Sequence, residues 1–120
     1  MSWIAMVPVV LVAALHLYIL WLEMFAWETR GPAAFRGLPR ELFPKTRVLA
    51  ANQGLYNGFL AAGLIWSLLI SDPDWSRNVA TCFLLFVLVA GAYGALTASR
   101  RIFLIQGVPA LIGLAAVQFL

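Results

Sequence analysis

Two ionisable residues interrupt an apolar N-terminal stretch, where they could hold or transfer protons. His16 and Glu23 are seven positions apart, almost two helical turns, so both lie on one face about 10 Å apart along the axis. Trp27 continues that face. A carboxyl group in hydrocarbon is costly when charged, so Glu23 must be protonated, paired or reached by water. An ionisable residue in such a place is a functional candidate by default.

Three further stretches bring polar side chains to the depth expected for Glu23. These side chains are Asn52, Gln53, Tyr56, Asn57, Tyr93 and Gln106. The first four of these, within residues 52–57, cover an arc of about 140° on a helix. This arc is wider than one line of hydrogen bonds to a neighbouring helix requires. They predict a polar cavity. The alternative is that the polar groups only hold helices together, at roughly 0.6 kcal/mol per hydrogen bond.

The composition indicates that this chain is an integral membrane protein. Of its 120 residues, 63% are hydrophobic and only 11% are charged, whereas soluble domains carry about a quarter charged residues. A soluble domain and a disordered chain are therefore both excluded. A disulfide scaffold is excluded because Cys82 is the single cysteine. We expect one integral membrane domain over residues 1–120.

Four stretches are apolar and long enough to cross a bilayer, and none alternates as a barrel strand would. They run over about residues 3–27, 48–70, 78–98 and 102–120. The predicted fold is all-α, a polytopic antiparallel bundle of four transmembrane helices. Small residues at four-residue spacing would let these helices approach closely. The Gly54 and Gly58 pair could equally form a homodimer face, but we favour a contact within the chain.

The basic residues predict the orientation of the bundle. Seven of the eight Lys and Arg residues lie in the loop 28–47 or at Arg100 and Arg101, and the loop between spans two and three holds only Arg77. Basic loops stay in the cytoplasm, so both termini should face outward. The loop 28–47 is either an amphipathic segment lying in the membrane interface or an ordinary basic loop. These charges favour lipid headgroups as partners and argue against nucleic acid.

Three functions are compatible with the polar cluster. The favoured one is binding of a small molecule or lipid in a cavity open to the cytoplasm, with proton-coupled transport as an extension. The second is a membrane enzyme that uses His16 and Glu23 as acid and base on an apolar substrate. The third is a structural accessory subunit. No cofactor motif is present, and His16, Glu23 and Cys82 are too few and too scattered for a metal site.

Two sequence runs resemble a known family. The segments His16-Leu-Tyr-Ile-Leu-Trp-Leu-Glu-Met-Phe-Ala-Trp and Asn52-Gln-Gly-Leu-Tyr-Asn-Gly resemble domain-of-unknown-function family 1304, small bacterial integral membrane proteins. The resemblance implies four spans in a bacterial inner membrane, but no activity. The positions that carry it are His16, Glu23, Trp27, Asn52, Gln53, Gly54, Tyr56, Asn57 and Gly58.

Overall fold

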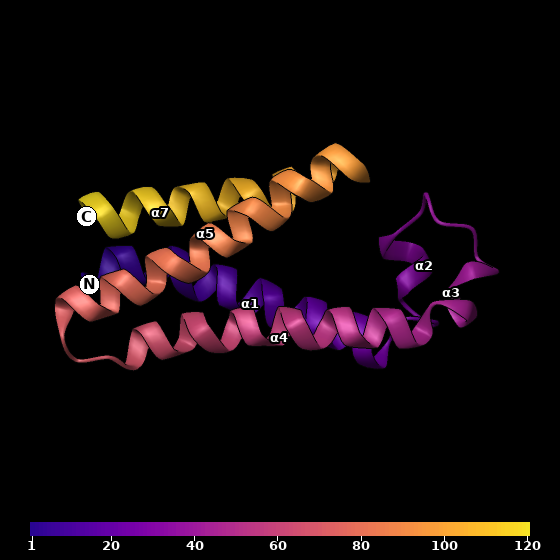
Figure 1. Cartoon of the computed structure of the whole chain (residues 1–120), viewed down its shortest axis with the longest axis horizontal. Helices are drawn as coiled ribbons and strands as arrows, with labels where there is room; N and C mark the ends of the chain where they lie inside the picture. Colours follow the sequence, from indigo (N-terminus) through magenta and orange to yellow (C-terminus); the bar gives the residue numbers. More distant parts are fainter. The chain divides into compact units, whose positions relative to one another are not determined.

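The computed structural model describes all 120 residues, and its regular structure is entirely helical. The long helices are α1 (Trp3–Phe25), α4 (Arg47–Leu69), α5 (Pro73–Thr97) and α7 (Val108–Phe119) (Figure 1). The short ones are α2 (Gly31–Ala34), α3 (Leu42–Lys45), α6 (Arg100–Ile102) and the π-helix η1 (Phe103–Gly107). The all-α prediction is therefore confirmed, with a helix over each of the four predicted stretches.

Three helical stretches are long and apolar enough to cross a membrane. They are α1, α5 and the continuous run Arg100–Phe119, which joins α6, η1 and α7. The helix α4 has 23 residues but does not reach the same apolar character, because Asn52, Gln53 and Asn57 lie in its first half. The composition and these three helices fit a membrane protein.

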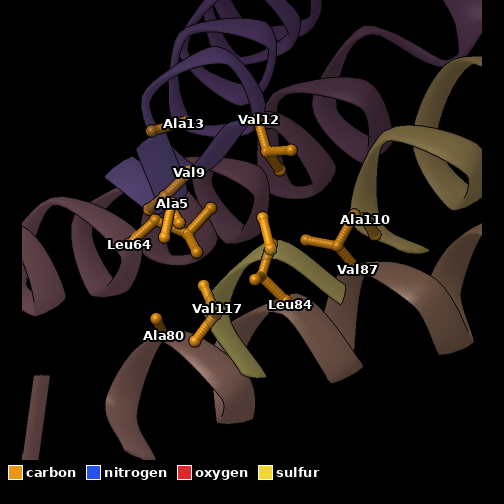
Figure 2. Close-up of a cluster of buried hydrophobic side chains, with 11 residues drawn as sticks. Ala5, Val9, Val12, Ala13, Leu64, Ala80, Leu84, Val87, Ala110 and Val117 are labelled. Atoms are coloured by element: carbon orange, nitrogen blue, oxygen red, sulfur yellow. The ribbon is translucent and has the colours of Figure 1, made fainter. Parts of the chain in front are cut away.

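The contacts of the chain divide into two compact units. One comprises residues 1–14 with 60–120, and the other comprises residues 15–59. In the first unit, small and branched apolar side chains from α1, α4, α5 and α7 form the buried core (Figure 2). Val9, Leu64, Leu84 and Val87 are fully buried there. Alanines such as Ala80 and Ala110 fill the narrow spaces between the helices.

The turn between α4 and α5 is fixed by short polar side chains. Asp72 caps α5, since one of its side-chain oxygens accepts hydrogen bonds from the amides of Asp74 and Trp75. Pro73 follows at the first helical position, where its missing N–H costs nothing. The buried Ser76 hydroxyl donates to the Ser67 carbonyl at 2.8 Å. Because of this cap, α5 begins at Pro73, ahead of the predicted span 78–98.

A π-helical turn interrupts the C-terminal run just before Pro109. The backbone N–H of Val108 donates to the carbonyl of Phe103, five residues earlier. A proline inside an α-helix clashes with the carbonyl four residues before it, and a wider turn relieves this clash. Beside the turn, a Cβ built on Gly91 would lie 2.8 Å from the Gly107 nitrogen. The small residues therefore bring α5 and η1 into backbone contact, as their spacing predicts.

The second unit pairs the C-terminal half of α1 with the N-terminal half of α4. A Cβ on Gly54 would lie 2.7 Å from Met24 Cγ and 3.2 Å from the Leu20 carbonyl oxygen, and a Cβ on Gly58 would overlap the Leu20 side chain. Both glycines thus face α1 of the same chain. The pair therefore makes the contact within the chain that its spacing predicts.

Candidate functional site

The centre of the candidate site is a hydrogen bond between α1 and α4. Asn57 Nδ2 donates to Glu23 Oε1 at 2.7 Å and to the Gln53 carbonyl oxygen at 3.1 Å. Both side chains are buried, with exposed fractions of 9% for Glu23 and 7% for Asn57. A buried carboxyl is tolerated only with hydrogen-bond partners, and Asn57 supplies one. Two of the predicted site residues are therefore in direct contact.

The glycine face of α4 places these two residues. Gly54 lies three positions before Asn57, on the same side of the helix, and a Cβ there would lie 3.0 Å from Glu23 Cβ. Without that Cβ, the backbone of α4 comes close enough for the short Asn57 side chain to reach the carboxyl of Glu23. A larger residue at position 54 would push the two helices apart and lengthen the hydrogen bond.

His16 is buried on α1, and its part in the site stays a prediction. Only 1% of its surface is exposed. It stands on α1 almost two turns before Glu23. No group of three or more His, Cys, Asp or Glu side chains lies together where it could hold a metal ion.

The other polar residues of α4 turn away from Glu23. Asn52 and Gln53 are exposed, and Asn52 Nδ2 donates to the Val48 carbonyl of its own helix at 2.9 Å. Tyr56 is 62% exposed, with its ring edge-on to Phe59. At 100° per residue, Asn52 and Asn57 differ by about 140°, so one α4 face cannot hold both against α1. A role for Asn52, Gln53 and Tyr56 in a cavity wall stays a prediction.

An open hollow of about 390 Å³ lies on the side of α4 that carries Asn52. Its lining combines one cation, one amide and several apolar side chains: Met24, Arg47, Val48, Ala51, Asn52 and Leu55. Met24 also lies against Gly54, which in turn contacts Glu23. Its volume is within the range of about 300–1,000 Å³ found for small-molecule sites, but the hollow is an open groove and not an enclosed pocket. Asn52 is the predicted site residue that the hollow contains.

Trp27 anchors the loop that follows α1. Its Nε1–H donates to Thr46 Oγ1 at 3.0 Å, and its ring lies 4.8 Å from that of Phe43 and 5.3 Å from that of Phe35. Phe43 is 1% exposed and packs against Gly31. The loop is therefore folded onto Trp27 through α2 and α3. Neither interpretation of the loop from its sequence included such a fold.

Tyr93 and Gln106 belong to the other compact unit. Tyr93 is 69% exposed on α5, and Gln106 is half-buried in η1. Their participation in the Glu23 site stays a prediction.

Known proteins of one family match this chain over nearly its whole length. Residues 10–118 match the family described as "Protein of unknown function (DUF1304)". The chain belongs to this family. It is 31% identical over 106 residues to the "Uncharacterized protein YpaA" of Lactococcus lactis subsp. lactis (strain IL1403), and the match covers 87% of both chains. No solved structure matches.

Membership of the DUF1304 family confirms the resemblance carried by the two sequence runs. All nine candidate site residues fall inside the matched range 10–118. The important residues that sequence reasoning missed are Thr46, Phe43 and Gly31, which hold Trp27 and the loop in place. The signal available for them was weak: apolar residues and a threonine within a segment broken by glycines and prolines.

Proposed function

We propose that this protein is a multi-pass protein of the bacterial inner membrane that binds a small molecule or lipid at the Glu23 site. In this proposal α1, α4, α5 and the Arg100–Phe119 run form one antiparallel four-helix bundle with both termini outside. The loop 28–47 and residues Arg100 and Arg101 face the cytoplasm. The helix α4 is 23 residues long, about 34 Å at 1.5 Å per residue, which is sufficient to cross the hydrocarbon core.

The single observation that carries the proposal is the buried hydrogen bond between Glu23 and Asn57. A structural contact between these helices needs no carboxyl group, since the glycines already bring the backbones together. Retaining an ionisable side chain within a membrane helix is costly and is typical of ligand sites and proton pathways. The hollow on the Asn52 side of α4, with Arg47 beside Met24 and Leu55, offers space for an amphipathic molecule that would reach Glu23 past Met24.

Proton-coupled transport is the extension of this proposal. Glu23 would take up and release a proton as the ligand enters and leaves, and Asn57 would hold the carboxyl in place in both states. His16, on the same helix, would carry the proton further into the bundle.

The decisive experiment is mass spectrometry of small molecules that co-purify with the protein in mild detergent. Wild type is compared with Glu23→Gln, which keeps an oxygen that accepts from Asn57 and therefore keeps the fold. Glu41→Gln is the matched control, because Glu41 is exposed in the loop. The proposal expects a compound retained by wild type and Glu41→Gln and lost from folded Glu23→Gln. Equal retention by all three, or no compound at all, contradicts it and favours an accessory subunit.

A further inference from the structure

A second hollow, of about 430 Å³, lies on the loop side of α1. It is lined by Tyr18, Trp21, Arg30, Ala33 and Ala34. It shares no residue with the hollow beside Met24 or with the Glu23 and Asn57 pair. The two hollows are therefore separate, and a ligand in this one would bind independently of the proposed function at Glu23.

The polar side chains that line this hollow are hydrogen-bond donors, and no carboxylate pairs with them. The ion pairs of the chain join Arg47 to Glu28 and Arg77 to Asp74, so the guanidinium of Arg30 has no carboxylate partner. The Trp21 indole adds an N–H and the Tyr18 phenol an O–H. No acidic residue lines the hollow. This combination is complementary to an anion, and a guanidinium is well suited to a phosphate group.

The apolar part of the hollow suits a hydrocarbon chain. The rings of Tyr18 and Trp21 stack obliquely, with centroids 5.9 Å apart, and both residues are about half exposed on α1. Ala33 and Ala34 of α2 have side chains too small to fill the space between the rings and Arg30. Since α1 is a candidate membrane span that ends at Phe25, the arginine lies beyond its end and the rings lie within it.

We infer that this hollow binds one anionic phospholipid, with its phosphate on Arg30 and an acyl chain along Tyr18 and Trp21. A lipid satisfies both halves of the lining, whereas free phosphate uses only the donors. The site also accounts for Trp21, which stands a full turn before the end of α1 rather than at the membrane boundary where tryptophans usually gather.

The test is a titration of the purified protein in neutral detergent, with bound lipid counted by native mass spectrometry. The probes are phosphatidylglycerol, phosphatidylcholine and inorganic phosphate. Arg30→Gln is compared with Arg40→Gln, which removes the same charge from an exposed loop position outside the hollow. We expect Arg30→Gln to weaken phosphatidylglycerol binding about fivefold and Arg40→Gln to leave it near wild type.

A second variant, Ala33→Phe, fills the hollow without changing the charge. Ala33 is exposed, so the fold should be kept, which thermal unfolding verifies, and one bound lipid should be lost. Three outcomes overturn the inference. They are equal weakening by Arg30→Gln and Arg40→Gln, equal binding of phosphatidylcholine, and displacement of the lipid by inorganic phosphate. The first would mean diffuse charge attraction, the second apolar contact alone, and the third a site for the free anion.

Discussion

Asn57 of α4 donates a 2.7 Å hydrogen bond to the carboxyl of Glu23 on α1, and both side chains are buried. The same Asn57 amide nitrogen donates to the Gln53 carbonyl oxygen of its own helix. The second hydrogen bond orients the amide, so that the first has a fixed direction. The pair thus combines an ionisable group with a partner whose geometry is determined by the helix that carries it.

Removing the amide should cost stability. Asn57→Ala leaves the buried carboxyl without this donor, for an expected loss of about 1–3 kcal/mol in the free energy of unfolding. Asn52→Ala is the matched control, because that exposed amide bonds only its own helix, and we expect a change within about 0.5 kcal/mol. Unfolding in mixed micelles of increasing denaturing detergent measures both. Equal losses in the two variants would show that the contact with Glu23 contributes nothing.

The hydrogen bond can be separated from other effects by a double-mutant cycle. The variants Glu23→Ala, Asn57→Ala and the double variant are compared with wild type by the same unfolding measurement. We expect a coupling free energy of about 0.6–1.7 kcal/mol, the range from average to strongest for hydrogen bonds between membrane helices. If the losses in the free energy of unfolding were simply additive, the hydrogen bond between Glu23 and Asn57 would contribute nothing to stability.

The close approach at Gly54 gives the next prediction. A Cβ there would lie 2.7 Å from Met24 Cγ and 3.2 Å from the Leu20 carbonyl oxygen, so Gly54→Ala should destabilise by about 1–3 kcal/mol. Gly37→Ala is the control, since a Cβ at position 37 meets nothing within 4 Å. Its effect should stay within about 0.5 kcal/mol. A Gly54→Ala protein as stable as wild type would mean that α1 and α4 do not pack this closely.

The sequence was sufficient to predict the parts of the fold that follow a helical period. Apolar length predicts where α1, α5 and the C-terminal run lie, and the glycine spacing predicts the face of α4 that meets α1. The sequence also predicts Glu23 and Asn57 as site residues at one depth. Their direct contact is a further step, because it depends on how closely Gly54 lets the helices approach.

The remaining features of the fold and site do not follow from a helical period in the sequence. The loop 28–47 folds onto Trp27 because Phe43 and Thr46 contact that side chain. These two residues follow Trp27 by 16 and 19 positions, across several glycines and prolines, and no spacing rule predicts contacts over such a segment. The sequence predicts one cavity wall from the arc of polar residues, about 140° wide, on α4. A helix spreads such an arc over two faces, so Asn57 packs inward while Asn52 and Tyr56 remain exposed.

The anchor between Trp27 and Thr46 should control the order of the loop. Trp27→Phe keeps a ring against Phe43 but removes the N–H that donates to Thr46, so we expect faster trypsin cleavage at Arg36 and Arg40. The control is Trp66→Phe, which changes an exposed ring on α4. Limited proteolysis followed by mass spectrometry gives the cleavage rates. Identical rates for both variants and wild type would show that the hydrogen bond does not hold the loop.

The proposed four-span topology predicts which side of the membrane each exposed position faces. In a Cys82→Ser background, single cysteines are introduced by Arg40→Cys in the loop and Ser71→Cys between α4 and α5, both exposed positions. A membrane-impermeant maleimide should label Arg40→Cys only in inside-out vesicles and Ser71→Cys only in spheroplasts. Arg101→Cys, in the second basic loop, should behave like Arg40→Cys.

This labelling bears most directly on α4, the long helix that its polar residues leave outside the candidate spans. If α4 crosses the bilayer, Ser71 must lie on the opposite side from Arg40, because only α4 and a short turn separate Ser71 from the loop. Labelling of both positions from the same side would remove α4 as a span. The buried Asn57 and Glu23 pair is the reason to expect opposite sides, since in the proposed topology Glu23 would satisfy, inside the membrane, the α4 polar group that faces α1.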